Sequence, residues 1–259
     1  MLRKGLLWAT VLIICLAGTS FAAGVEVAVG GWRQDLDGTL SYQAISSNDL
    51  IDLEEDINFD DEDAFFGRIK IETPAFIPNF YLVAAPAQLE GTGRKSVALT
   101  FGDTTFNADA ALSSKVRANQ YDIGIYYGLP FIKTATAGML NLDVGVNIRI
   151  ADLEVEITGA SGGITVTERE DLMVPVPMLY AALQFAPIDA LAFEAEIRAI
   201  SVGDNSFYSL TGRLRLQFPG PFFIAGGYRL DKLEVDEDED DLITDIELGG
   251  PFVEVGLKF

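Results

Sequence analysis

The stretch Leu140-Asn-Leu-Asp-Val-Gly-Val-Asn-Ile-Arg-Ile150 alternates between large apolar residues and polar or small residues along its whole length. Successive side chains of a β-strand point to opposite faces of the sheet, so this period of two places all the large apolar side chains on one face. The other face carries Asp143 and Arg149. The stretch therefore predicts a strand at about residues 139–152 with one apolar and one polar face.

The same alternation recurs along the chain and predicts ten strands. Each is about as long as a tilted membrane-spanning strand, which needs about 9–11 residues. Short connections that contain proline alternate with connections that are mostly longer or acidic, including 36–63, 92–114 and 153–172. No linker divides the chain, which predicts one domain over residues 23–259. The strands are expected at about 25–35, 64–74, 80–91, 115–129, 139–152, 173–186, 191–202, 206–218, 222–234 and 246–259.

The composition excludes several functional classes. The chain has 259 residues, with 18 Lys and Arg against 39 Asp and Glu, and its net charge of −21 argues against nucleic-acid binding. It has no histidine, so catalytic sites and metal sites that depend on histidine are absent. We therefore expect that the protein is not an enzyme, with carboxylate-only chemistry left open, and we expect no cofactor. The acidic runs 60–63 and 236–241 lack the spacing of a calcium loop, so no metal site is expected either.

The N-terminal segment has the form of a secretory signal peptide. Basic residues Arg3 and Lys4 precede an apolar run over 6–17, and small residues follow it. This run is shorter than the roughly 20 residues that a membrane-spanning helix needs. We predict a signal peptide over residues 1–22, cleaved between Ala22 and Ala23.

Alternation alone does not say which face of the sheet meets water. In a soluble lipocalin-like barrel the apolar face points inward, whereas in a membrane barrel it points to the lipid. A membrane sheet must close, because closure leaves no unpaired edge in the lipid, and the even count of ten strands returns both termini to the same side. The chain also ends on an alternating apolar strand, and we interpret Val253, Val255, Leu257 and Phe259 as a signal for barrel assembly. Aromatic residues cluster near the short turns, as in an interfacial girdle, at Phe76, Phe80, Tyr81, Phe131, Phe185, Phe218, Phe222, Phe223 and Phe259.

Three motifs carry a resemblance to a known family. They are Val174-Pro-Val-Pro-Met-Leu-Tyr180, Ser201-Val-Gly-Asp204, and Gly227-Tyr-Arg-Leu-Asp231 followed by an acidic run. With them the chain resembles an uncharacterised family of proteobacterial outer-membrane β-barrel proteins. The resemblance implies a multi-pass barrel in the outer membrane of a Gram-negative bacterium and carries over no functional residues.

The polar face of the predicted barrel is rich in charged residues. It is interpreted either as a lining that selects ions or as a plug of paired charges, and the interleaving of acids and bases favours the plug. The cluster consists of Arg68, Lys70, Glu72, Arg149, Glu194, Glu196, Arg198, Arg213, Arg215, Arg229, Asp231 and Glu254.

Three functional hypotheses follow. The first is an outer-membrane barrel that is structural or passes small solutes. The second is an outer-surface binding module whose long acidic loops recognise a cation or a partner. The third is a soluble periplasmic lipocalin-like barrel that holds an apolar ligand.

The expected partners follow from the membrane location. They are outer-membrane lipid and lipopolysaccharide, and, during biogenesis, the barrel assembly machinery and periplasmic chaperones. We expect a monomer.

Four prolines fit a closed barrel poorly. A closed sheet has no edge on which a missing N–H is harmless, and eight or twelve strands would follow if the segments containing these prolines are miscounted. They are Pro86, Pro175, Pro177 and Pro251.

Overall fold

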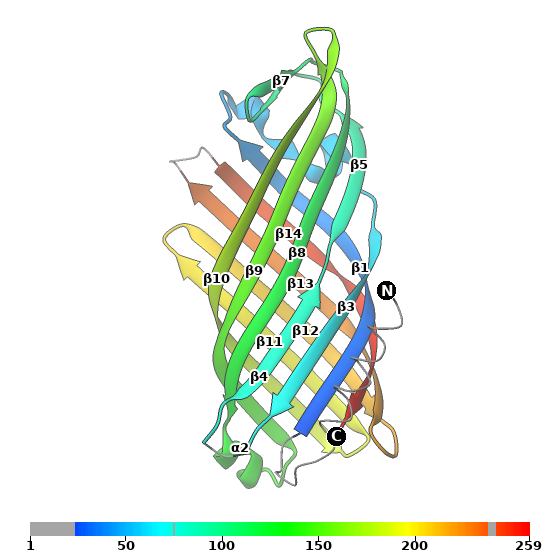
Figure 1. The fold of residues 1–259 in the computed structure, drawn as a ribbon, viewed down its shortest axis with the longest axis vertical. Helices are drawn as coiled ribbons and strands as arrows, with labels where there is room; N and C mark the ends of the chain where they lie inside the picture. Colours follow the sequence, from blue (N-terminus) through cyan, green and yellow to red (C-terminus); the bar gives the residue numbers. More distant parts are fainter. Residues whose placement is uncertain (1–23, 75, 238–241) are drawn as a thin grey trace, which may run out of the picture.

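The computed structural model describes residues 24–74, 76–237 and 242–259, which form a closed antiparallel β-barrel (Figure 1). The predicted signal peptide and its cleavage site between Ala22 and Ala23 lie outside these residues. The barrel strands are β1 (Gly24–Tyr42), β3 (Glu62–Glu72), β4 (Asn79–Ala85), β5 (Gln88–Arg94), β8 (Ala111–Gly128), β9 (Leu140–Ser161), β10 (Ile164–Ile188), β11 (Leu191–Val202), β12 (Asn205–Gln217), β13 (Phe222–Glu237) and β14 (Leu242–Lys258).

Pairing between β1 and β14 closes the sheet. β4 and β5 both pair with β8 and form one interrupted barrel strand, and the short β2 (Ile51–Asp52) only adds to β1. The sheet therefore forms ten barrel strands, which confirms the fold predicted from the alternation. No helix within the described residues is long and apolar enough to cross a membrane.

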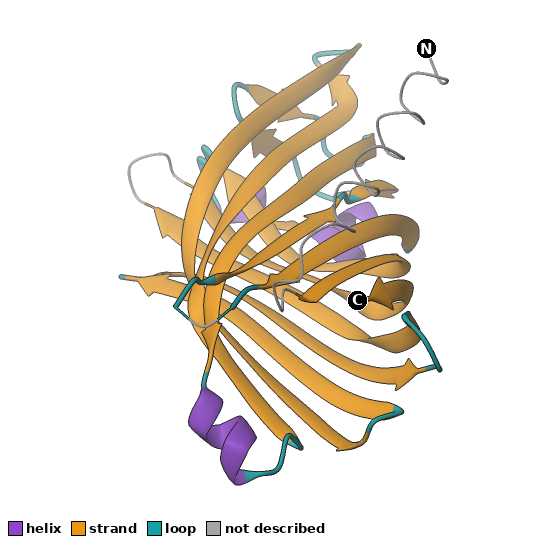
Figure 2. Ribbon diagram, turned by 60° about the horizontal axis from the view of Figure 1, so that its bottom comes forward, coloured by secondary structure: helices purple, strands orange, loops and turns teal. Residues whose placement is uncertain are grey.

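The two ends of the barrel differ. The two ends of the described part of the chain meet at one end of the barrel, where the backbone N–H of Phe259 donates to Val25 O at 2.9 Å. The short helix α2 (Pro130–Ala135) lies at this end, and two shorter helical segments, η1 (Ser47–Asp49) and η2 (Leu53–Ile57), lie among the loops of the opposite end (Figure 2). Outer-membrane barrels place their termini and short turns in the periplasm, so the end with η1 and η2 is the outer one.

Apolar side chains cover the outside of the barrel and charged side chains fill its inside. In β9, for example, Val146 and Ile148 are exposed whereas Asn147 and Arg149 are buried. A soluble lipocalin-like barrel requires the opposite arrangement, so the structure decides against that hypothesis. The outer apolar surface includes Val27, Val29, Ile69, Phe80, Leu82, Ile123, Ile125, Val144, Val146, Ile148, Leu179, Leu183, Phe193, Ile197, Leu210, Leu214, Leu216, Ile224, Val253 and Val255.

Strands β8, β9 and β10 extend beyond the other strands at the outer end (Figure 1). The sequence predicts a loop over 153–172, and that prediction is wrong: β9 and β10 stay paired up to a two-residue turn at Gly162 and Gly163, both with positive φ. Apolar alternation marks a strand only where one face meets lipid or a core. Beyond Ile150 the apolar residues of β9 change to the inner face, where Val155 and Ile157 join a buried apolar cluster, while Glu154 and Glu156 face outward. The alternation of the membrane part is therefore broken there, although the pairing continues.

The prolines occupy interruptions in the barrel wall. β10 pairs with β11 only from Leu179 towards the periplasm, so Pro175 and Pro177 lie where β10 has no partner on that side. Pro86 separates β4 from β5, and its carbonyl accepts a hydrogen bond from Gln34 Nε2 at 3.0 Å. Pro251 lies where the register between β1 and β14 skips two residue pairs. The wall therefore does contain local edges that tolerate a missing N–H.

A hydrophobic cap fills the outer mouth of the barrel. The loop strands β6 (Leu99–Phe101) and β7 (Thr104–Phe106) form a hairpin, and buried residues of this hairpin and of η2 join the apolar inner face of β1, β5, β8 and β9. The cap therefore closes the outer end with a packed core. Its members include Leu36, Leu40, Ile51, Leu53, Ile57, Leu89, Leu99, Phe101, Phe106, Leu112 and Ile157.

The buried carboxylate of Asp49 connects the segment around η1 with strand β6 of the hairpin. It accepts hydrogen bonds from the backbone N–H of Thr100 at 2.7 Å and of Ser46 at 2.8 Å. Burial alone would raise the pKa of Asp49, but the bonds from Thr100 and Ser46 outweigh it and hold the pKa below its ordinary value.

We expect the cap to loosen in acid. Because the folded pKa of Asp49 lies below the unfolded one, its carboxylate stabilises the cap above about pH 4, and this contribution is lost as the pH falls through the folded pKa. Amide hydrogen exchange at Thr100, corrected for the intrinsic rate, should show protection falling in acid. Asp49→Asn should remove this acid dependence, and an unchanged acid-dependent loss in that variant would contradict the assignment.

Candidate functional site

The inside of the barrel holds a layer of buried, paired charges. All residues of the predicted lumen cluster lie on the inner face. Glu72 differs from the others because it is exposed at the periplasmic rim, where it lies 3.5 Å from Lys258. The layer also contains two carboxylates outside the predicted cluster, Glu26 and Asp122. Six buried arginines thus face six buried carboxylates, and Lys70 adds a largely buried ammonium group. They are Arg68, Arg149, Arg198, Arg213, Arg215 and Arg229, with Glu26, Asp122, Glu194, Glu196, Asp231 and Glu254.

Glu196 of β11 is the centre of this layer. Its carboxylate lies 2.6 Å from Arg213 Nη1, 3.0 Å from Arg198 Nη2 and 3.1 Å from Lys70 Nζ. It also accepts a hydrogen bond from the hydroxyl of Tyr81 at 3.0 Å. Strands β3, β4, β11 and β12 therefore meet at one buried carboxylate in the middle of the barrel.

A chain of ion pairs continues from this centre towards β1 and β14. Arg68 lies 2.7 Å from Glu254 and 2.6 Å from Glu26. Arg215 lies 2.9 Å from Glu26 and 2.8 Å from Glu194. Each of these carboxylates thus contacts at least one arginine on another strand, and the pairs cross-link the barrel wall from inside.

A second group lies towards the outer end. Arg149 donates two hydrogen bonds to Asp122, both at 2.9 Å, and lies 3.5 Å from Asp231. Arg229 pairs with Asp231 at 2.7 Å. Arg198 lies 3.9 Å from Asp122 and connects this group with the Glu196 centre.

Aromatic rings fill the space between the charges. Trp32 faces the Arg229 guanidinium at 4.6 Å, and Tyr81 faces Arg198 at 4.9 Å. Tyr81 and Phe223 are therefore not part of the girdle that the sequence predicts, because both rings point inward; Phe223 contacts Arg68 and Arg215. The other seven predicted girdle residues are exposed: Phe76, Phe80, Phe131, Phe185, Phe218, Phe222 and Phe259.

Strand parity is the signal that could have identified the missed residues. Tyr81 lies between the exposed Phe80 and Leu82, and Asp122 lies between the exposed Tyr121 and Ile123. Position on a strand therefore separates inner from outer aromatic residues, whereas residue type alone does not.

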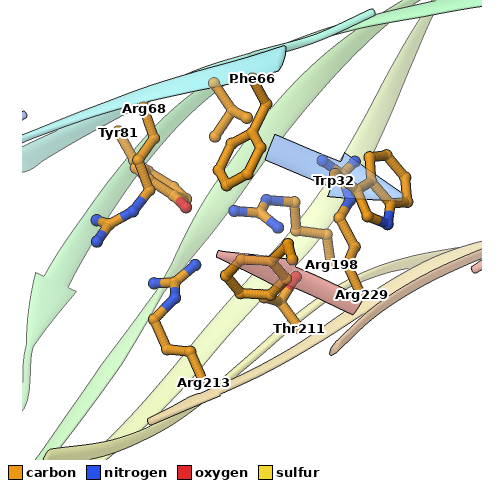
Figure 3. A pocket seen from close by; sticks show the side chains of 10 residues that line it. Trp32, Phe66, Arg68, Tyr81, Arg198, Thr211, Arg213 and Arg229 are labelled. Carbon is orange, nitrogen blue, oxygen red and sulfur yellow. The ribbon is translucent and has the colours of Figure 1, made fainter. Parts of the chain in front are cut away.

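The packed layer leaves little open space. A cavity of about 20 Å³ lies among the inner side chains, and Figure 3 shows Arg68, Arg198, Arg213 and Arg229 around it with Trp32 and Tyr81. Such a volume holds about one water molecule. At this level the barrel is filled by its own side chains.

The remaining predicted sites lie at the two ends. Val253 and Val255 point to the outer surface and Phe259 is exposed beside Val25, but the role of this strand in assembly stays a prediction. In the acidic runs, Asp61 pairs with Arg33 at 2.8 Å, and residues 238–241 lie outside the described part of the chain. Within that part, no group of three or more acidic, cysteine or histidine residues is placed to hold a metal ion.

Comparisons with known proteins support the fold. No family model and no curated protein sequence matches the chain. Among solved structures it is similar to the outer membrane protease OmpT from Escherichia coli, with a TM-score of 0.52 and 11% identity over 94% of this chain and 99% of that chain. The translocator domain of the autotransporter NalP from Neisseria meningitidis gives a TM-score of 0.46 and 11% identity over 99% of this chain and 96% of that one. These likenesses concern the fold alone.

The comparison with OmpT corrects one expectation. The absence of histidine led us to expect that the protein is not an enzyme, but a barrel of this fold is a protease. A fold does not determine function, and a missing residue type removes only the mechanisms that need it. The exclusion of enzymes as a class is therefore wrong.

Closure, outer apolar surface and fold together establish the location. A closed barrel leaves no backbone group unpaired towards lipid, and its outer surface is apolar. The protein is an integral β-barrel of the bacterial outer membrane.

Proposed function

We propose that the protein is a non-conducting outer-membrane barrel that holds a rigid binding surface outside the cell. The observation that supports this most is the filled lumen, in which paired charges and aromatic rings leave a cavity of about 20 Å³. A solute would have to break several buried ion pairs to pass, and separating buried charges costs several kcal/mol per group. The geometry thus favours the plug over the pore.

The outer end of the barrel supports the proposed binding surface. The cap closes the mouth with a packed core, and β8, β9 and β10 form a wall above the membrane level. Ion pairs brace the outer face of this wall: Lys115 lies 3.0 Å from Glu90, and Arg169 lies 2.7 Å from Glu154. A braced surface held outside the membrane suits recognition, because little order has to be gained on binding.

Conductance in a planar bilayer tests the proposal. Protein refolded into lipid vesicles, shown to be folded by its change in gel mobility on boiling and then fused with the planar bilayer, should give no discrete current steps. A double variant, Arg68→Ala with Glu254→Ala, removes a buried pair together and should produce brief steps, because it opens space without leaving an unpaired charge. Steady steps from the unchanged protein, with ion selectivity that Arg213→Glu alters, would establish the pore instead.

We also propose that the chain belongs to the uncharacterised family of proteobacterial outer-membrane β-barrel proteins that it resembles at 174–180, 201–204 and 227–231. Lipopolysaccharide and outer-membrane lipid are proposed to surround the barrel, and the assembly machinery and periplasmic chaperones to deliver it as a monomer.

A further inference from the structure

The outer part of β10 has an open edge. Its register with β9 is constant from Ile164 to Phe185, and Ala186 N donates to Met139 O in the same register. Even-numbered residues of β10 therefore exchange backbone hydrogen bonds with β9, and odd-numbered residues point their N–H and C=O groups the other way. Pairing on that side begins only at Leu179. Within the described residues, no strand pairs with the β10 edge over 164–178.

Only the part of this edge nearer the membrane is blocked by proline. Proteins usually protect exposed strand edges with prolines, charged side chains, bulges or a covering loop. Pro175 and Pro177 have odd numbers, so their missing N–H groups fall on the open side and stop the pairing with β11 from extending outward. Over 164–174 the edge has no proline, so its backbone N–H groups stay available, and its charged residues at 168–171 restrict which strand can pair with it. Thr165, Thr167, Arg169, Asp171 and Met173 are exposed there.

The side chains on the inner face of this edge are acidic in its outer part. Glu168 and Glu170 lie on the inner face next to the β6–β7 turn, where Thr104 donates a hydrogen bond to Glu168. Burial, together with the charges of Glu168, Asp103 and Asp171, raises the pKa of Glu170. Negative charge is therefore concentrated on this face without a described cationic partner for Glu170.

Apolar side chains continue the same face towards the membrane. Leu172 is half exposed at 50%, and Val174 and Val176 are partly buried. A strand laid along this edge would therefore meet carboxylates at one end and apolar groups at the other.

We propose that this edge, residues 164–174 of β10, binds an extended segment of a partner protein as an added strand. Backbone hydrogen bonds would supply the affinity, and the side chains would require basic residues opposite Glu168 and Glu170 and apolar residues opposite Leu172 and Val174. This rests on the proposed function and names the binding surface and the chemistry of its partner. A second copy of this chain fits less well, because pairing two such edges would bring their carboxylates together.

The test uses the full mature protein in detergent micelles and two synthetic peptides. One peptide, Val-Thr-Val-Thr-Lys-Thr-Lys-Thr, matches the edge in the antiparallel direction, and its control carries Glu in place of both Lys. We expect the Lys peptide to bind and to slow amide hydrogen exchange at Thr167, Arg169 and Asp171. The even-numbered amides, which already pair with β9, should change little.

Two kinds of variant distinguish how much backbone hydrogen bonds and how much charge contribute to peptide binding. Asp171→Pro removes an N–H on the open side and spares the pairing with β9, so it should weaken binding by about tenfold or more, whereas Asp171→Asn should not. Thr167→Pro serves as a second edge variant if the first fails to fold. Glu168→Gln with Glu170→Gln should weaken binding about three- to tenfold.

Several results would overturn the inference. They are equal binding of both peptides, no binding of either, protection confined to another segment, or full affinity in both proline variants. Self-association that Asp171→Pro abolishes would show that a second copy is the occupant instead. The conductance experiment tests separately whether the barrel is closed to ions. Failure of the edge proposal and failure of the proposed function can therefore be distinguished.

Discussion

Replacing Glu196 by alanine should lower the free energy of unfolding by about 3–5 kcal/mol, which is the usual cost of leaving buried charges without their partner. Glu196 contacts Arg213, Arg198 and Lys70, and all three cations are largely shielded from water. Its removal leaves each of them with fewer compensating charges in the middle of the barrel. Equilibrium unfolding in urea, followed by the emission of Trp32, measures the loss.

Two further variants make this result interpretable. Glu196→Gln keeps a hydrogen-bond acceptor but removes the charge, and it should fall between the alanine variant and the unchanged protein. Glu90→Ala breaks an exposed ion pair with Lys115, whose side chain is 51% exposed, and should cost less than about 1 kcal/mol. A loss of similar size at Glu90 and Glu196 would show that the buried layer has no special role in stability.

Replacing Trp32 by alanine should destabilise the barrel by a comparable amount, about 3–5 kcal/mol. The indole is 2% exposed, faces Arg229 at 4.6 Å and lines the small central cavity. Its loss enlarges that cavity and removes the ring that packs on the guanidinium. Because Trp32 is the sole tryptophan after the predicted signal peptide, unfolding of this variant must be followed by circular dichroism or gel mobility.

A conservative replacement is the control for this prediction. Trp32→Phe keeps an aromatic ring beside Arg229 and should recover most of the loss. If Trp32→Ala cost less than about 1 kcal/mol, the cavity would have to collapse easily, and the view of the lumen as a tightly packed plug would be wrong.

The alternation of residues was sufficient to predict the ten strands, and the terminal apolar strand and the aromatic positions then favoured a membrane barrel over a soluble one. A strand with one face in lipid must repeat every second residue, and this is a local property that can be read from stretches such as 140–150. The same parity placed Arg149, Glu196 and Arg213 on one face. It could not show that these residues meet one another, because they come from different strands.

The tertiary structure decided which charges pair, which aromatic residues point inward and how the outer end is built. Glu196 contacts Lys70 from a strand 126 residues away, a distance in the chain that no local pattern reports. The extension of β9 and β10 was missed because its apolar residues, such as Val155 and Ile157, lie on the inner face against the cap, opposite to the face that is apolar within the membrane. Pro175 and Pro177 appeared to conflict with a closed sheet until the structure showed an open edge at that height. Local periodicity thus determined the strands and their faces, whereas closure of the barrel determined the contacts between faces.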